Sequence, residues 1–201
     1  MSNLKVKLYF SPLGLLLHYF TKVMAMFGQK CIVYGYRQNG KYFPRTRIAS
    51  TAIITDKNKL TIADNVWINH YSRIDASGGV KIGRGCQIGF GSCILSHSSH
   101  IAIRLMGESY METPLEKRVG YIHKKTEIGE YTFIGGGSYV MPGVSIGKGC
   151  VIGVNSVVTH NIPDFAIAVG SPANIIGSTK DTDKHFLDNE IVKQTYYERK
   201  T

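Results

Sequence analysis

An aliphatic residue recurs at every sixth position through much of this 201-residue chain. One series begins at residue 62 and gains two residues at "SGG"; a second runs without a slip from residue 122 to residue 158. The members are Ile62, Ile68, Ile74, Ile82, Ile88, Ile94, Ile122, Ile128, Ile134, Val140, Ile146, Ile152 and Val158. A helix repeats every 3.6 residues and a strand every two, so this spacing is compatible with strands and not with one helix.

Six residues are three strand periods, so the aliphatic side chain of every unit faces the same way. Repeats this short form solenoids, in which each unit makes one flat side of a coil and three units complete a turn. One coil alone buries too little apolar surface to offset the entropy of ordering it, so the coils must stack. Glycine follows several aliphatics directly, and we expect these glycines at corners where bulkier residues would be strained. Small or compact residues stand four positions after the later aliphatics, at Thr126, Thr132, Ser138, Val144, Cys150 and Ser156.

The chain is basic, with 24 lysines and arginines against 14 acidic residues. Its length predicts one domain, and its charge predicts an anionic partner such as a phosphate-bearing cofactor, a charged glycan or a lipid headgroup. Nucleic acid is disfavoured, because the basic residues are scattered and no zinc-finger spacing or uninterrupted basic run occurs.

The cysteines form no CxxC pair and follow no secretory leader, so we expect small buried thiols in a reducing, cytoplasmic compartment. These are Cys31, Cys86, Cys93 and Cys150.

The best hydrophobic stretch is "SPLGLLLHYFTKVMAMFG", residues 11–28, in which Ser11 and Pro12 favour a helix start and Gly28 a stop. A helix over residues 12–27 is shorter than a bilayer span. Its apolar residues share one face, which leaves two interpretations: a helix packed on the rest of the protein, or a helix lying at a membrane interface.

The repeat is interrupted between Ile94 and Ile122 by "LSHSSHIAIRLMGESYMETPLEKRVGY". A loop this long is uncommon in a repeat protein unless it has a function. It opens with His97 and His100, so we expect an excursion over residues 97–121 that walls a cleft or reaches a neighbouring subunit.

These features resemble the hexapeptide-repeat acyltransferases, the left-handed parallel β-helix superfamily. The resemblance covers roughly residues 46–177 and implies an all-β domain with one excursion, preceded by an N-terminal helix and lead-in (1–45) and followed by a helical tail (178–201). It also implies a homotrimer and acetyl-CoA as co-substrate. Left-handedness comes from the family, because the general chirality rule would favour a right-handed crossover.

In the sugar acetyltransferases of this superfamily, a histidine just before such an excursion is the general base, and "SHSSH" looks like that element. Imidazole suits the task, since its pKa near 6.5 lets it take a hydroxyl proton and return it to a departing thiolate. The resemblance favours His100, which is nearer the excursion, with His97 as the alternative.

The segment "VVTHNIPDFAIAVGSPANIIG" resembles the element that closes the acetyl-CoA groove of these enzymes. Phe133 falls where several relatives carry tryptophan, and relatives have basic residues after the Pro-Ala pair where this chain has "ANIIG". Lys180, with Lys148 and Lys184 as alternatives, is the candidate to meet the CoA phosphates. The cofactor residues implied by position are Phe133, Gly136, Val154, Thr159, Ser171, Pro172, Ala173 and Lys180.

The loop most resembles the O-acetyltransferases of bacterial surface polysaccharides, whose acceptors are often lipid-linked glycans. This would place the enzyme at the cytoplasmic face of the inner membrane, with Arg45, Arg104 and Tyr110 as acceptor-binding candidates. Alternatives are acetylation of a small free sugar or antibiotic, a non-catalytic scaffold, and a zinc hydratase of the same fold. The spacing of His70, His97, His100 and His123 matches that hydratase poorly, so we assign no metal ligand.

Overall fold

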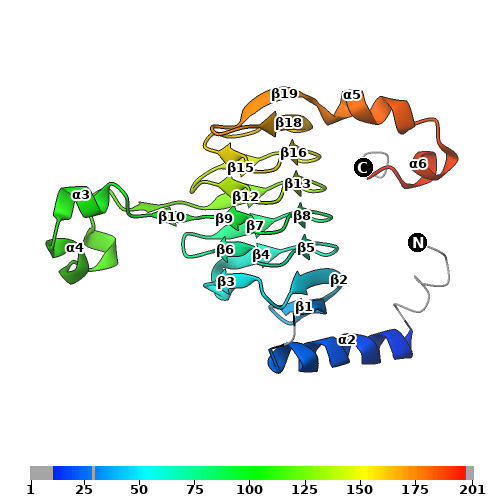
Figure 1. Ribbon diagram of the computed structural model, residues 1–201, viewed down its shortest axis with the longest axis horizontal. Helices are drawn as coiled ribbons and strands as arrows, with labels where there is room; N and C mark the ends of the chain where they lie inside the picture. The colour runs from blue at the N-terminus through cyan, green and yellow to red at the C-terminus, as the bar shows by residue number, and fades with distance from the viewer. Residues whose placement is uncertain (1–10, 29, 198–201) are drawn as a thin grey trace.

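The computed structural model describes residues 11–28 and 30–197. The predicted terminal segments also include residues 1–10, 29 and 198–201, which lie outside the described residues. Figure 1 shows a column of short stacked strands, with helix α2 (Pro12–Met26) at one end and an arm that leaves the column midway.

Three sheets form the sides of the column. The first sheet contains β1 (Ile32–Gln38), β2 (Lys41–Ala49), β5 (Trp67–Ile68), β8 (Gln87–Ile88), β13 (Phe133–Ile134), β16 (Val151–Ile152), β18 (Ala166–Val169) and β19 (Asn174–Ser178). The second contains β3 (Ile53–Thr55), β6 (Arg73–Asp75), β9 (Cys93–Ile94), β14 (Tyr139–Val140) and β17 (Val157–Val158). The third contains β4 (Leu60–Ile62), β7 (Val80–Ile82), β12 (Thr126–Ile128) and β15 (Ser145–Ile146). Successive coils pair in parallel, so each coil adds one strand to each sheet.

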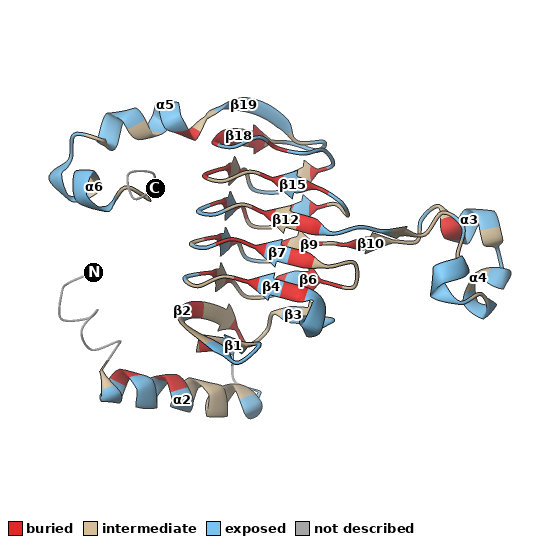
Figure 2. Ribbon diagram, turned by 180° about the vertical axis from the view of Figure 1, so that it is seen from behind, coloured by how far each residue is buried: buried red, intermediate tan, exposed pale blue. Residues whose placement is uncertain are grey.

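The periodic aliphatics stack into three rows inside the column, as predicted. Ile128 pairs with Ile82 below and Ile146 above, and Ile134 and Val140 occupy the equivalent places in the other two sheets. All these side chains are at most 2 % exposed, and Figure 2 shows buried residues concentrated in the strands of the column. Burial of this continuous apolar stack is what stabilises coils that could not fold singly.

Ile122 is the exception, and its assignment to the interior is wrong. It lies in β11 (Ile122–His123), which pairs antiparallel with β10 (His97–Ser98) in a ribbon outside the column. The column resumes only at Lys124, whose backbone N–H donates to Ser96 O at 2.9 Å. The excursion therefore extends to residue 123, two residues beyond the predicted end.

The small residues of the repeat are buried, and their hydroxyls link successive coils. Thr132 Oγ1 donates to Gly147 O at 2.8 Å and accepts from the backbone N–H of Cys150 at 3.1 Å. Ser138 and Ser92 donate to carbonyls of the next coil in the same way. These side chains satisfy backbone groups that the ladder leaves free at each corner.

Glycine is required directly after the aliphatics for a different reason from the one expected. Gly129 does not have a positive φ; instead, a Cβ there would lie 2.5 Å from backbone atoms of Gly147 and Lys148. Close approach of one coil to the next, rather than strained dihedrals, excludes a side chain at this position.

Both ends of the column are closed by antiparallel strands. β1 and β2 form a hairpin whose second strand pairs in parallel with β5, so the structure continues through the predicted boundary at residue 45. At the other end β18 pairs antiparallel with β19, followed by α5 (Thr179–Asp183), the 3₁₀ turn η3 (Lys184–Phe186) and α6 (Glu190–Thr195). The hairpin carries no six-residue signal because its strands run antiparallel.

All four cysteines are free, but only Cys86 and Cys150 are buried, whereas Cys31 and Cys93 are half-buried. Burial raises the pKa of the Cys86 thiol to about 12, which keeps it protonated and unreactive. The expectation of four buried thiols is therefore wrong for Cys31 and Cys93.

Candidate active site

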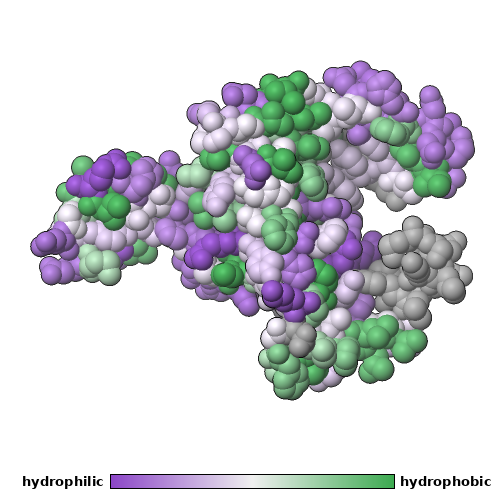
Figure 3. All heavy atoms as spheres, viewed as in Figure 1, coloured by the Kyte–Doolittle hydropathy of each residue, from purple (hydrophilic) through white to green (hydrophobic). Residues whose placement is uncertain are grey.

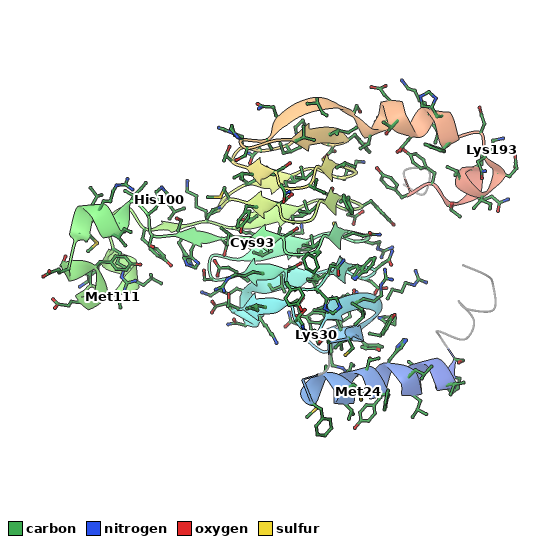
Figure 4. All side chains as sticks on the ribbon, in the orientation of Figure 1. Met24, Lys30, Cys93, His100, Met111 and Lys193 are labelled. Atoms are coloured by element: carbon green, nitrogen blue, oxygen red, sulfur yellow. The ribbon has the colours of Figure 1, made fainter. Side chains whose placement is uncertain are left out.

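The ribbon leaves the column directly after β9 and carries the two candidate histidines. His97 lies in β10 opposite His123 of β11, and its ring stacks on Tyr121 with 5.8 Å between ring centroids. Beyond the ribbon, the arm consists of α3 (Ala102–Met106), α4 (Ser109–Glu112) and the 3₁₀ turn η2 (Leu115–Lys117). In Figure 4, His100 lies where the arm leaves the ribbon, while Met111 lies farther out on the arm.

His97 contacts a buried carboxylate that sequence reasoning missed. Its Nδ1 contacts Asp75 Oδ2 and lies 2.7 Å from Ser77 Oγ. The side chain of Asp75 is 3 % exposed and that of His97 is 38 % exposed, so the pair joins the column interior to solvent. The hydrogen-bond partner of Nδ1 is the Ser77 hydroxyl, and the carboxylate lies beside it.

The ionised form of Asp75 is favoured despite its burial. Burial acts to raise the pKa of Asp75, but hydrogen bonds from Ser77, the nearby His97 and the hydroxyl of Thr55 together hold this pKa below its ordinary value. The backbone N–H of Ser77 and the Thr55 hydroxyl donate to Asp75 Oδ1 at 3.2 and 3.1 Å. A charged acceptor is therefore fixed beneath His97.

His100 has a different environment. Its side chain is exposed, and its Nδ1 lies 2.7 Å from Ser98 Oγ. The guanidinium of Arg104 donates to the backbone carbonyl of His100, which joins the first turn of the arm to the ribbon. On the arm itself, Arg118 lies 4.2 Å from the ring centroid of Tyr110. The structure therefore places Arg104 beside His100 and Tyr110 farther out on the same arm.

Three of the predicted cofactor residues line one edge of the column, between the first and second sheets. Gly136 O accepts from the N–H of Asn155 at 2.9 Å, and Gly170 O accepts from the N–H of Val157 at 2.9 Å. These bonds stack Gly136, Val154 and Ser171 in successive coils. Val154 is 69 % exposed, so the edge offers an open apolar surface.

A hollow of about 270 Å³ lies beside this edge and includes Phe133. Phe133 is 41 % exposed and points outward, while its neighbour Ile134 is fully buried. The hollow suits a thin apolar ligand, because its lining combines aromatic rings with glycine backbone. Its lining includes Trp67, Asn69, Gln87, Phe90, Phe133 and Gly136.

Pro172 and Ala173 continue from Ser171 across the end of the column, and Thr159 lies at a different edge. The backbone N–H of Ala173 donates to Val157 O at 2.9 Å, so the segment Ser171–Pro172–Ala173 crosses the end of the column toward Thr159. Thr159 follows β17 and therefore lies at the edge from which the ribbon also leaves.

Lys180 is not brought to the Gly136 edge. It follows β19, at the opposite end of β18 from Ser171, and its Nζ lies 4.1 Å from the centroid of the Phe165 ring. Arg45 is likewise separated from the arm, because its backbone N–H donates to Asp64, which precedes β5 on another edge.

Within a single chain, the histidines of the zinc alternative form no metal-binding group. Across residues 11–28 and 30–197, no group of three or more His, Cys, Asp or Glu residues has the geometry to hold a metal ion. His70 Nδ1 instead lies 2.9 Å from Thr51 Oγ1.

Comparison with known proteins supports the interpretation of the repeat. Residues 125–160 match the family model "Bacterial transferase hexapeptide (six repeats)". A galactoside O-acetyltransferase of Lactococcus lactis is 44 % identical over 75 residues, which cover 37 % of this chain and 36 % of the relative. A galactoside O-acetyltransferase of Escherichia coli is 31 % identical over 133 residues, covering 66 % of this chain and 51 % of the relative. The chain thus spans between a third and about half of these relatives.

Solved structures show the same fold. A hexapeptide-repeat acetyltransferase of Vibrio cholerae complexed with acetyl-CoA has a TM-score of 0.52 at 24 % identity, over 63 % of this chain and 64 % of that one. A variant of the Bacillus cereus N-acyltransferase AntD has a TM-score of 0.53 at 23 % identity, over 75 % of this chain and 89 % of that one. This similarity of fold supports the left-handed coil that the family resemblance implies. The matched repeat, the three-sided column and these relatives make the chain similar to the hexapeptide-repeat acetyltransferases.

Proposed function

We propose that the protein is an O-acetyltransferase that moves an acetyl group from acetyl-CoA to a sugar hydroxyl, with a histidine of the ribbon as general base. The observation that carries this proposal is the pair His97 and His100 at the root of the arm, in a column whose repeat matches transferases. Sequence relatives named galactoside O-acetyltransferase support the reaction class.

The reaction requires one proton transfer and no covalent enzyme intermediate. Imidazole accepts the proton of the sugar hydroxyl as that oxygen attacks the thioester carbonyl. The C–O bond of the new ester forms and the C–S bond breaks, and imidazolium returns its proton to the departing thiolate. Acetyl-CoA supplies the activated acyl group, while this chain supplies the base and the surfaces that orient both substrates.

His100 is the proposed base, because it is exposed at the start of the arm and matches the position expected from the family resemblance. His97 is the alternative, since the buried carboxylate of Asp75 lies against its ring and favours the imidazolium that would form during the reaction. Arg104 and Tyr110 on the arm are the proposed acceptor contacts, with Arg45 as a more remote candidate.

The CoA arm is proposed to run along Gly136 and Val154 with Phe133 beside it, toward Ser171, Pro172 and Ala173. The open glycine edge and the aromatic hollow fit a thin extended ligand. Thr159 stays a candidate for its adenine end, whereas Lys180 lies away from this edge.

The catalytic unit is proposed to be a homotrimer. On one chain the histidines and the glycine edge lie at opposite edges of the sheet formed by β9, β14 and β17. A complete site therefore needs the histidine edge of one subunit and the glycine edge of its neighbour. The acceptor is proposed to be a bacterial surface-polysaccharide precursor, held on lipid at the cytoplasmic side of the inner membrane.

The test is acetyl transfer from labelled acetyl-CoA to a panel of glycans, with alkali-labile label marking ester rather than amide products. His100→Ala should lower turnover by about 100 to 10,000-fold with folded protein. His97→Ala is the paired variant, and His185→Ala in the exposed tail is the matched control. Loss with His97→Ala alone would transfer the role of base to His97, and full activity in both variants would refute a histidine mechanism.

A further inference from the structure

Helix α2 attaches to the column through a narrow side of small and polar residues. Gly14 and His18 are its buried residues, and the His18 ring stacks on Tyr34 with 5.1 Å between centroids. On the same side, Cys31 Sγ donates to Thr21 O at 3.4 Å. Positions 14, 18 and 21 share one face of a helix, so this face points to the hairpin.

The apolar side of α2 faces away from the protein. Leu16 is 64 % exposed and Phe20 is 56 % exposed, although a packed helix normally buries such residues. Together with Leu17, Tyr19 and Val23 they line a wholly apolar hollow of about 480 Å³. Figure 3 shows this hydrophobic surface along α2 at one end of the molecule.

The part of the chain that contains α2 and the neighbouring hairpin has a basic surface. Residues 11–60 contain eight lysines and arginines and a single acidic residue, Asp56. The cations are Lys22, Lys30, Arg37, Lys41, Arg45, Arg47, Lys57 and Lys59. Several lie over aromatic rings: Lys22 is 5.7 Å from the Tyr42 centroid, and Lys41 is 5.5 Å from that of Phe43.

We propose that α2 and this basic surface bind an anionic phospholipid membrane. The helix would lie in the interface with Leu16 and Phe20 among the acyl chains, while the basic side chains meet headgroup phosphates. Within the part of the chain that the structure describes, no helix is long and apolar enough to cross a bilayer. This surface binds lipid whether or not the ribbon histidines catalyse acyl transfer.

The test is flotation of the full-length protein with vesicles of equal parts phosphatidylglycerol and phosphatidylcholine, compared with pure phosphatidylcholine. We expect binding to the anionic vesicles, weakened by salt, and little binding to the neutral ones. The double variant Leu16→Glu with Phe20→Glu should reduce vesicle binding at least about tenfold. Lys22→Glu with Lys41→Glu should reduce it selectively on anionic vesicles.

Control variants place one change of each kind elsewhere on the surface. Ile191→Glu alters a 72 % exposed apolar residue of α6, and Lys184→Glu reverses an exposed charge in the tail; neither should affect flotation. Light scattering on each variant reports its oligomeric state. Absence of wild-type binding, or equal loss with the control variants, would overturn the proposal. A change of oligomeric state in the Leu16/Phe20 variant with unaltered flotation would instead identify the face as a contact between copies.

Discussion

The carboxylate of Asp75 lies one coil below His97 and contacts its Nδ1. Asp75 belongs to the rigid column, whereas His97 opens the ribbon that carries the arm. The pair therefore connects the ladder to the root of the arm, and its loss should affect both the stability of the column and the orientation of the ribbon.

Asp75→Asn should lower the free energy of unfolding by about 1–3 kcal/mol at neutral pH, because a buried charged acceptor is lost. The folded-state pKa of Asp75 is lowered, so its contribution is present above the pKa of the unfolded chain and is lost as pH falls through the folded-state value. The stabilities of wild type and variant should therefore converge in acid. Denaturant titrations at neutral and acid pH measure this, with exposed Asp188→Asn as control; an unchanged gap in acid would contradict it.

Thr132→Val should destabilise the column by about 1–3 kcal/mol, because it leaves the Gly147 carbonyl and the Cys150 amide without their hydroxyl partner. Thr132→Ser keeps the hydroxyl and should recover most of this loss. Chemical unfolding of the two variants provides the comparison. A Thr132→Ser variant that is less stable than Thr132→Val would show that the methyl packing of Thr132 matters more than its hydrogen bonds.

Gly129→Ala should destabilise the protein by about 1–3 kcal/mol or more, because its Cβ would meet backbone rather than a movable side chain. Gly177→Ala is the matched control, since its Cβ would lie 3.9 Å from the nearest neighbour, Ile167. Thermal unfolding should separate the two variants by several degrees. Similar melting temperatures would mean that the coils can move apart at little cost.

Ile134→Ala should cost about 2–5 kcal/mol, because it opens a cavity in the interior stack. The adjacent Phe133→Ala removes a partly exposed ring and should cost less stability, while weakening acetyl-CoA binding if Phe133 lines the cofactor groove. Thermal unfolding without CoA measures the stability of each variant, and the increase in melting temperature with CoA reports binding, since a bound ligand stabilises the folded state. Undiminished CoA protection of Phe133→Ala would remove this residue from the groove.

The column was predictable because its signal is local: one aliphatic per unit, repeated in register. Ile122 kept that spacing but lies in an antiparallel ribbon, and the spacing alone does not show where chain pairing changes direction. Asp75 was missed because its partner lies 22 positions later in the sequence, and only the coil register brings them together. Lys180 was grouped with Ser171 by proximity in sequence, whereas β18 and β19 carry them to opposite ends.

The ladder continues across the point where the arm departs. Cys93 pairs with Tyr139, and the N–H of Leu95 donates to Val140 O at 3.0 Å, as though the intervening residues were absent. The arm is therefore an appendage whose length and composition can be exchanged without rebuilding the support. Grafting a different arm between His100 and Tyr121 should leave both the scaffold and the contact of His97 with Asp75 intact, so that acceptor preference could be altered without redesign of the support.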